Sequence, residues 1–308
     1  MIGKVTKSTG SWYNVRVEEL NNVTIPCRIK GKFRLNDIKH TNPIAVGDIV
    51  EVQFENDSET GLITSIQPRK NYIIRKSSNL SKQTQIIASN IDQVLLIASL
   101  IYPQTALGFI DRFIVTAEAY HIPPIIIFNK LDLYQNELND LLNETLSIYK
   151  SIGYTCIAVS AHTGENCNQV IELLKNKTTL VSGNSGVGKS SLLNKISPTL
   201  KLKTGEVSTF SQKGKHTTTF AEMFSLDFGG YVIDTPGIKE FGIVEIEDTE
   251  ISHYFIEMRP YINQCKFNNC KHLNEPGCAV IKAVKEYKII PERYESYIKI
   301  LTKADFYE

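Results

Sequence analysis

The sequence predicts a multidomain α/β protein with three parts: a small β-barrel over residues 1–70, an α/β domain over residues 71–245, and a mostly helical domain over residues 246–308. Three observations lead to this prediction. Short strands with alternating apolar residues fill the first part, apolar strands alternate with helical patterns in the second, and a Cys/His cluster lies among polar helical patterns in the third.

Composition limits the function classes. The 308 residues are 42% hydrophobic and 22% charged, which is typical of a soluble globular protein with two or three domains. The net charge of +1 provides no global attraction to nucleic acid or membrane, so such a partner has to meet a local patch. The N-terminus lacks the apolar core of a signal peptide, and no apolar run is long enough to span a bilayer. We therefore expect a cytoplasmic protein without a membrane partner. We also expect a monomer, although composition does not determine the oligomeric state.

The first part contains four short runs with strand character: YNVRV, TIPCRI, DIVEVQF and GLITSI. So many short strands in so few residues favour a closed barrel, because closure removes exposed strand edges. One segment, RIKGKFR, places a basic strip around Phe33, consisting of Arg28, Lys30, Lys32 and Arg34. This pattern is typical of a surface that follows a nucleic-acid backbone, but a solvated charged hairpin would have the same composition.

The middle part alternates between strand and helix patterns, as expected for a parallel sheet. Apolar strands at 93–100, 124–128, 156–160 and 178–183 are each followed by a helical pattern, at 109–120, 137–150, 168–176 and 189–196. This βαβ alternation predicts a sheet with helices on both faces. Residues 217–228 then alternate as a strand, and the run YVIDTPG completes the sheet.

A phosphate-binding loop follows one of these strands. The segment Gly183-x4-Gly188-Lys189-Ser190 lies between an apolar strand and a helical pattern, which is the context that a P-loop requires. Lys189 is expected to reach the β- and γ-phosphates, and Ser190 to ligate Mg²⁺. We expect the nucleotide to be contacted by the whole segment, namely Val181, Ser182, Gly183, Asn184, Ser185, Gly186, Val187, Gly188, Lys189, Ser190 and Ser191.

Two further loops predict that the base is guanine. NKLD, consisting of Asn129, Lys130, Leu131 and Asp132, follows an apolar strand, so it lies at the carboxyl edge of the sheet, where ligands bind. A carboxylate at Asp132 can accept hydrogen bonds from guanine N1–H and the 2-amino group, which adenine lacks. Ser160 and Ala161, at the end of another strand, resemble the loop that contacts guanine O6.

The switch residues come after the P-loop. Asp234 is predicted to hold Mg²⁺ through water, and the Gly237 N–H to sense the γ-phosphate. Within KGKHTTT, Thr217 is expected to complete the metal shell, with Thr218 and Thr219 as alternatives.

The residue that orients the attacking water is less well defined by the sequence. Ile238 occupies the position where many GTPases have a water-orienting Gln. His216 is the internal candidate for that role, although a switch histidine in contact with solvent, or a partner that completes the site, would also fit the sequence. Gly186 stands where potassium-assisted GTPases commonly have Asn, so we do not expect that route of activation.

The motifs occur in a rotated order: base loop, second base loop, P-loop, threonine switch, DTPG. Such a rotation preserves the packed sheet if the original termini lie close together. It also attaches whatever follows the second switch directly to that switch. The following segment contains Cys265, Cys270, His272 and Cys278, whose three thiols and one imidazole match a structural Zn²⁺ site. Lys266, Lys271, Lys282 and Lys285 could add phosphate contacts around this site or simply be solvated.

Taken together, this motif order behind a small barrel resembles the circularly permuted small ribosomal subunit biogenesis GTPases, the RsgA (YjeQ) family, over essentially the whole chain. The resemblance implies an OB-fold RNA-binding domain, a P-loop GTPase domain with the order G4-G5-G1-G2-G3, and a zinc-binding domain. It also implies GTP/GDP with Mg²⁺ and one structural Zn²⁺, binding to the small (30S) ribosomal subunit through its rRNA, subunit-stimulated GTP hydrolysis, and a role in late maturation. A P-loop kinase, or a GTPase with a protein or membrane partner, are the alternatives.

Overall fold

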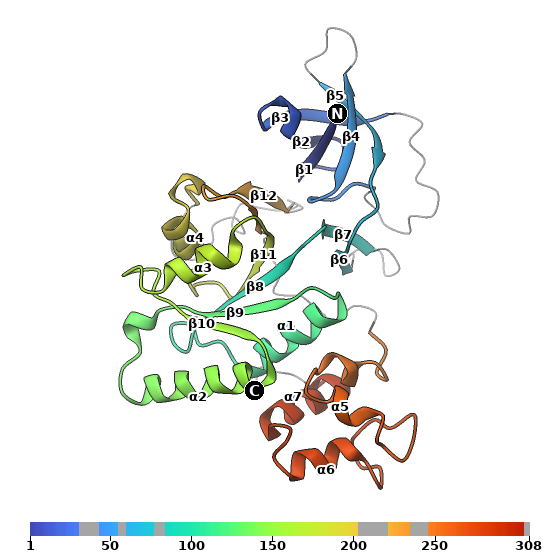
Figure 1. Cartoon of the computed structure of the whole chain (residues 1–308), viewed down its shortest axis with the longest axis vertical. Coiled ribbons are helices and arrows are strands. Elements are labelled where there is room, and N and C mark those ends of the chain that lie inside the picture. Colours follow the sequence, from blue (N-terminus) through green and yellow to red (C-terminus); the bar gives the residue numbers. More distant parts are fainter. Residues whose placement is uncertain (31–42, 55–59, 77–83, 203–220, 235–245, 305–308) are drawn as a thin grey trace.

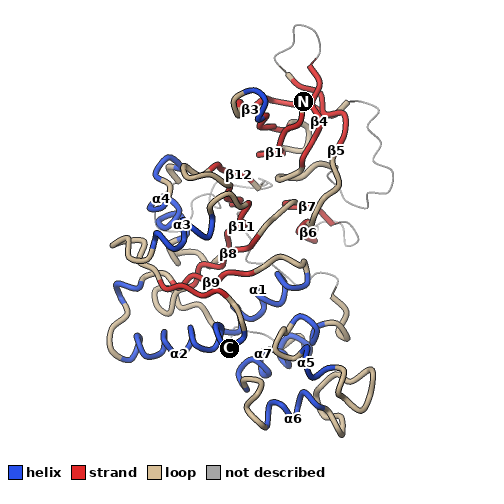
Figure 2. The backbone as a smooth tube through the Cα atoms, viewed as in Figure 1, coloured by secondary structure: helices blue, strands red, loops and turns tan. Residues whose placement is uncertain are grey.

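The computed structural model describes residues 1–30, 43–54, 60–76, 84–202, 221–234 and 246–304. Figure 1 shows a barrel, an α/β layer and a helical C-terminal region in succession along the long axis of the molecule, and Figure 2 shows the same arrangement by secondary structure. Within the described ranges, no helix has both the length and the apolar character needed to cross a bilayer.

The barrel is closed and OB-like, as expected. Its five strands are β1 Ile2–Ser8, β2 Tyr13–Val17, β3 Val23–Ile29, β4 Ile49–Phe54 and β5 Gly61–Ile66. The strands run in the order β1-β2-β3-β5-β4, and an additional β1–β4 pairing closes the ring. Alternate side chains of β2 point inward to form the core, together with residues such as Val5, Cys27 and Ile63. The strand β1 had not been identified from the sequence.

The α/β domain contains the predicted elements. Its strands lie in the order β10 (Thr155–Ala158), β9 (Pro124–Phe128), β8 (Gln93–Ala98), β11 (Thr178–Ser182), β13 (Tyr231–Asp234) and β12 (Glu222–Ser225). All neighbouring pairs are parallel except β12–β13, which is antiparallel. The strand 231–234 was expected to complete the sheet. It belongs to the sheet as β13, but it lies between β11 and β12.

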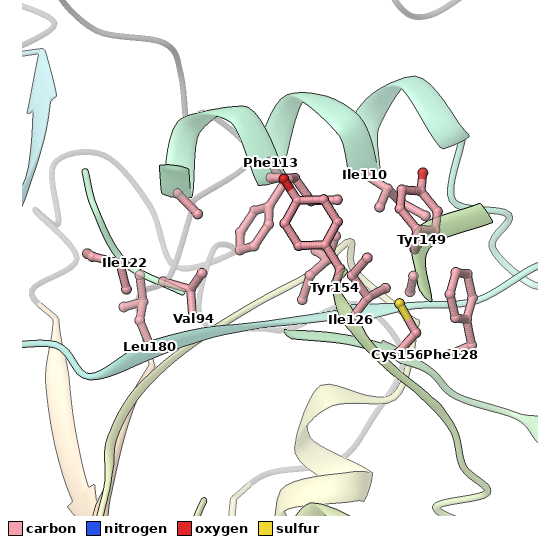
Figure 3. Packing of buried hydrophobic residues seen from close by; sticks show 14 of the residues in the cluster. Val94, Ile110, Phe113, Ile122, Ile126, Phe128, Tyr149, Tyr154, Cys156 and Leu180 are labelled. Atoms are coloured by element: carbon pink, nitrogen blue, oxygen red, sulfur yellow. The ribbon is translucent and has the colours of Figure 1, made fainter. Parts of the chain in front are cut away.

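Helices cover both faces of this sheet. α1 (Leu107–Ala119) and α2 (Glu137–Ile152) pack on one face, and α3 (Cys167–Leu174) and α4 (Lys189–Ile196) on the other. Successive residues of β8 alternate between the two cores, with Val94 and Leu96 on the first face and Leu95 and Ile97 on the second. Because both faces are buried, the strands are continuously apolar. Figure 3 shows the first core, where Phe113 and Tyr154 lie between α1 and the sheet.

In the part of the chain that the structure describes, the barrel and the α/β domain share one continuous sheet of eleven strands, which the sequence did not predict. The connection is the antiparallel pairing of β1 with β12 at Lys7 and Glu222. Their side chains also form an ion pair, with Lys7 Nζ 3.2 Å from a Glu222 carboxylate oxygen. Arg16 Nη1 adds a hydrogen bond of 2.8 Å to Ser225 Oγ.

A hairpin between the two domains was also missed. β6 (Tyr72–Lys76) and β7 (Thr84–Ser89) pair with each other. Beside them, the fully buried Asp48 carboxylate accepts hydrogen bonds from Arg69 Nε (2.7 Å) and Ser89 Oγ (2.6 Å). This paired charge connects the barrel to the segment that leads into the α/β domain.

The C-terminal region consists of short helices: 3₁₀ helix η6 (Ile251–Tyr254), α5 (Arg259–Ile262), α6 (Ala279–Lys285) and α7 (Pro291–Thr302). Helices η6 and α5 are separated at Phe255, whose backbone is extended. The interruption buries the Phe255 ring edge-on against Tyr297, with 5.5 Å between the ring centroids. Helix α7 contacts α1 of the α/β domain.

Candidate functional site

The predicted nucleotide-binding segments meet at the carboxyl edge of the parallel sheet. The P-loop follows β11, the NKLD loop follows β9, and Ser160 and Ala161 follow β10. The pairing of Val181 with Asp234 places that carboxylate beside the strand that leads into the P-loop. His216, Thr217, Thr218, Thr219 and Gly237 lie outside the described residues, as does Ile238.

The backbone of the P-loop requires its glycines. Gly183, Gly186 and Gly188 have φ angles of 146°, 82° and 93°, a region that other residues rarely adopt. A Cβ on Gly183 would lie 2.2 Å from the Ile97 carbonyl oxygen, and one on Gly188 would lie 2.3 Å from Asn129 Nδ2. A side chain at Gly183 would therefore collide with β8, and one at Gly188 would collide with the base loop.

The side chains of the P-loop differ in exposure. Lys189 begins α4, and its Nζ donates hydrogen bonds to the carbonyl oxygens of Gly183 (2.7 Å) and Asn184 (2.8 Å). Ser190 is half-buried and Ser191 is exposed in the same first turn of α4, whereas Ser185 and Gly186 are exposed in the loop. Val181, Ser182 and Val187 are buried and anchor the loop to the sheet.

Asn129 connects three of the loops. Its side chain is buried, and Nδ2 donates a hydrogen bond of 2.9 Å to the Val187 carbonyl oxygen in the P-loop. Its Oδ1 accepts a hydrogen bond of 3.0 Å from the Ala161 backbone N–H in the second base loop. The base loop and the P-loop, which the rotated order separates in the sequence, are therefore directly connected in space.

The acidic residue of the base loop is held by the second base loop. Ser160 Oγ donates a hydrogen bond of 2.5 Å to Asp132 Oδ1, and Oγ itself accepts one of 3.0 Å from the Thr163 N–H. Among the described residues, no side chain or backbone N–H donates a hydrogen bond to Asp132 Oδ2. The second oxygen is thus available to an incoming donor.

The two middle residues of NKLD have structural partners. The Leu131 N–H donates a hydrogen bond to the Val159 carbonyl oxygen (3.0 Å), and its side chain packs on the core below α1. Lys130 has a φ of 72°, and its Nζ donates a hydrogen bond to the Tyr102 carbonyl oxygen. Burial lowers the pKa of Lys130, against the opposing effect of the Asp132 carboxylate.

Two residues beside the site were not identified from the sequence. The buried Tyr134 hydroxyl contacts the base loop and also the loop 99–106, which joins β8 to α1. Ser99 lies at the start of that loop and contacts the same hydroxyl. The one sequence signal was an aromatic residue two positions after Asp132, which on its own indicates only burial.

The four predicted metal ligands come together in the C-terminal region. One ligand atom from each of Cys265, Cys270, His272 and Cys278 lies within 4.8 Å of all the others. Cys265 Sγ is 3.9 Å from Cys278 Sγ, and His272 Nδ1 is 3.5 Å from Cys265 Sγ and 3.4 Å from Cys278 Sγ. Zinc bond lengths in a tetrahedron require about 3.8 Å between two sulfurs and about 3.5 Å between nitrogen and sulfur. The residues fit such an ion.

The surroundings of the cluster hold the ligands in place. The Tyr294 hydroxyl donates a hydrogen bond of 2.5 Å to the His272 carbonyl oxygen, and the Ile281 N–H lies 3.4 Å from Cys278 Sγ. Burial raises the pKa of the Cys270 thiol to about 12. A thiolate at this position is therefore stabilised by a nearby cation.

The basic residues proposed for RNA contact are exposed where they are described. Arg28 and Lys30 are exposed on the barrel, and the Arg28 guanidinium stacks 3.8 Å from the centroid of the Trp12 ring. Lys32, Phe33 and Arg34 lie outside the described residues. Near the metal cluster, Lys266, Lys271, Lys282 and Lys285 are exposed, and Lys282 is 3.8 Å from the Glu286 carboxylate.

Comparisons with known proteins agree with this architecture. The family model described as RsgA GTPase matches residues 66–244, and the model described as RsgA N-terminal domain matches residues 2–63. Among similar curated proteins, the small ribosomal subunit biogenesis GTPase RsgA of Flavobacterium psychrophilum is 53% identical over 307 residues, covering 99% of this chain and 94% of its own. The protein of the same name from Phocaeicola vulgatus is 52% identical over 301 residues, covering 98% and 96%.

Two solved structures are similar over the whole length. The crystal structure of YjeQ from Thermotoga maritima has a TM-score of 0.82 and 35% identity, covering 98% of this chain and 97% of its own. The crystal structure of YloQ, described as a circularly permuted GTPase, has a TM-score of 0.77 and 33% identity, covering 98% and 94%. The likeness includes the barrel, the permuted sheet and the C-terminal region.

Proposed function

This chain belongs to the RsgA GTPase family, whose members hydrolyse GTP to GDP and phosphate. From that premise we propose that it is an assembly factor of the small (30S) ribosomal subunit. It binds the subunit through rRNA and acts late in its maturation, with GTP hydrolysis stimulated by the subunit. The observation that carries the nucleotide part is the Asn129 side chain, which joins the base loop, the P-loop and the second base loop into one site.

Within that site we assign the base contacts to the NKLD loop and the Ser160–Ala161 turn. Asp132 accepts from guanine N1–H and the 2-amino group. Ser160 holds the carboxylate in place through Oδ1, and both oxygens keep lone pairs that can accept further hydrogen bonds. Lys130 lies along the base face. A site built around a carboxylate rejects adenine, since the wrong base would leave the charge without its donors.

The phosphate side is assigned to the segment 181–191 and to Asp234. The Lys189 ammonium, which now contacts two carbonyl oxygens of its own loop, moves its donors to the β- and γ-phosphates. Ser190 and Asp234 would bind Mg²⁺, which neutralises the negative charge that develops on the phosphates. Thr217 and Gly237 as switch residues, and His216 as the group that positions water, remain predictions from the sequence.

The same proposal assigns a separate role to each of the three domains. Residues 1–70 and 246–308 flank a GTPase domain over 71–245, and both flanking domains contact rRNA through exposed basic residues, including Arg28 and Lys30. Cys265, Cys270, His272 and Cys278 hold one structural Zn²⁺. The protein acts as a cytoplasmic monomer, and the permutation links the switch after Asp234 directly to the zinc-binding domain.

The experiment that tests the partner is GTP turnover by the purified full-length protein, alone and with either ribosomal subunit. We expect slow turnover alone, strong stimulation by small subunits, and no stimulation by large subunits at the same concentration. Stimulation should decline with salt if it depends on phosphate contacts. Equal rates with both subunits would contradict the proposed partner while leaving the GTPase assignment intact.

A second experiment tests the base contact. Asp132→Asn should weaken GTP binding by about 10²-fold and shift the preference to xanthosine triphosphate, whose 2-oxo group accepts from an amide donor. Asp140→Asn, which changes an exposed carboxylate on α2, is the matched control and should bind GTP normally. A competition titration in which Asp132→Asn still prefers GTP would show that another residue reads the base.

A third experiment tests the metal. Protein purified without chelator should contain one Zn²⁺ per chain, and Cys270→Ala should lose it, because removing one thiolate opens the tetrahedral site. Cys156→Ala removes a buried thiol from the α/β core and should keep the metal. GDP binding should persist in Cys270→Ala, since the α/β domain has its own core. Elemental analysis showing no zinc in the wild-type protein would reject the assignment.

A further inference from the structure

The Tyr134 hydroxyl lies at the junction of two loops of the nucleotide site. It donates a hydrogen bond of 2.5 Å to the Asn129 carbonyl oxygen in the base loop. It also accepts one of 3.0 Å from the Leu100 N–H, and Ser99 Oγ is 3.2 Å away. The side chain is only 6% exposed, so water cannot replace these partners.

The hydroxyl of Tyr134 acts both as a donor and as an acceptor at this junction. Each hydroxyl has one proton, and the Tyr134 proton is directed to Asn129. Tyr134 Oη accepts from the Leu100 N–H, while Ser99 Oγ, 3.2 Å away, donates its own proton to the Ile101 carbonyl oxygen at 2.7 Å. Removing the Tyr134 hydroxyl leaves one buried donor and one buried acceptor without partners.

The second loop also reaches the nucleotide site. In the loop 99–106, the Tyr102 carbonyl oxygen accepts the hydrogen bond from Lys130 Nζ. Pro103 Cδ is 3.2 Å from the position that a Cβ on Gly186 would occupy, so the loop lies against the P-loop. Tyr134 therefore supports the base loop directly and a neighbour of the P-loop through Leu100.

The base loop needs such support because its backbone is strained. Lys130 has a φ of 72°, a conformation that costs about 1 kcal/mol or more for a residue other than glycine and persists where neighbouring contacts impose it. The peptide between Asn129 and Lys130 is fixed by the Tyr134 hydrogen bond to its carbonyl oxygen. The adjacent hydrogen bond from the Leu131 N–H to Val159 fixes the next peptide.

We propose that Tyr134 is a positioning residue that sets guanine affinity and selectivity, because its hydroxyl holds the NKLD loop in the conformation that presents Asp132 to the base. This inference rests on the proposed function and specifies which side chain maintains the base-reading geometry. Tyr134 contacts the backbone of the base loop through the Asn129 carbonyl oxygen and does not itself contact the base.

Tyr134→Phe is the informative variant, because it removes the hydroxyl and keeps the ring in the core. Tyr154→Phe is its matched control. Tyr154 belongs to the same hydrophobic cluster, and its buried hydroxyl has no hydrogen-bond partner in the part of the chain that the structure describes. Both variants lose the same atom from the same core, but only one of them affects the base loop.

The measurements are dissociation constants for GDP, for inosine diphosphate, which lacks the 2-amino group, and for tripolyphosphate. Tyr134→Phe should bind GDP about 10-fold more weakly, bind inosine diphosphate only about 3-fold more weakly, and bind tripolyphosphate as the wild type does. Tyr154→Phe should match the wild type with all three ligands. If Tyr134→Phe folds poorly, Ser99→Ala should reduce the same GDP preference to a smaller extent.

The outcomes separate this inference from the function on which it rests. A wild-type protein that does not prefer GDP to inosine diphosphate would contradict the base site itself. A wild type with that preference and a Tyr134→Phe variant with the same preference would overturn the role of Tyr134. Equal weakening for both nucleotides, together with a lower melting temperature, would also overturn it, because that pattern indicates a purely structural residue.

Discussion

Replacing Lys189 by Ala should abolish GTP turnover, both in the isolated protein and with small ribosomal subunits present. The Lys189 ammonium donates hydrogen bonds to the P-loop carbonyls of Gly183 and Asn184, and we expect it to stabilise the negative charge that develops on the transferred phosphoryl group. Removing one such preorganised group costs about 10²- to 10³-fold in rate. Since the isolated protein is expected to be slow, its residual activity should fall below detection.

The measurement is phosphate release under single-turnover conditions at saturating GTP, so that weaker binding is not mistaken for slower chemistry. Lys175→Ala is the control, because this exposed lysine follows α3 at the opposite edge of the sheet. It should turn over GTP at the wild-type rate. Substantial hydrolysis by Lys189→Ala would show that this P-loop does not supply the catalytic charge.

Replacing Arg293 by Met should weaken the attachment of the C-terminal region to the α/β domain by about 3–5 kcal/mol. Arg293 on α7 is 1% exposed and contacts two carboxylates, with Nη1 2.6 Å from Asp111 Oδ1 and Nε 2.7 Å from Glu257 Oε1. Burial acts to lower the pKa of Arg293, but the attraction of Asp111 and Glu257 outweighs burial and raises that pKa. Without the guanidinium, the Asp111 and Glu257 carboxylates lose their cation, and Asp111 keeps only the hydrogen bond from the Tyr149 hydroxyl.

The matched control is Arg259→Met. Arg259 also joins the C-terminal region to α1, through Glu118 at 2.7 Å, but its side chain is 48% exposed. An exposed pair of this kind contributes about 0–1 kcal/mol. Amide exchange of residues 251–302 should rise strongly in Arg293→Met and little in Arg259→Met, with the P-loop helix α4 unaffected. Equal exchange in the two variants would mean that the buried network does not hold the domains together.

Much of the site is already determined by the sequence. The P-loop, NKLD, the Ser160–Ala161 turn and DTPG are short motifs whose chemistry depends on adjacent residues, so they can be recognised without knowing the fold. The same holds for the cysteine cluster, whose four ligands lie within fourteen residues, Cys265 to Cys278. The apolar strands and amphipathic helices were also predictable. The spacing of apolar residues within one strand or helix depends only on which faces of that element are buried.

The connections between these motifs were decided by the tertiary structure alone. The pairing of β1 with β12 joins Lys7 to Glu222, and the Arg293–Asp111 ion pair spans 182 positions. Asn129 could be recognised as part of a base loop, but its hydrogen bond to Val187 depends on how two strands lie side by side. Tyr134 is visible in the sequence only as an aromatic residue, and the Leu100 N–H that the fold places against its hydroxyl could not be inferred from the sequence. Local patterns specify which groups are present, whereas partners distant in the chain meet only after the sheet has assembled.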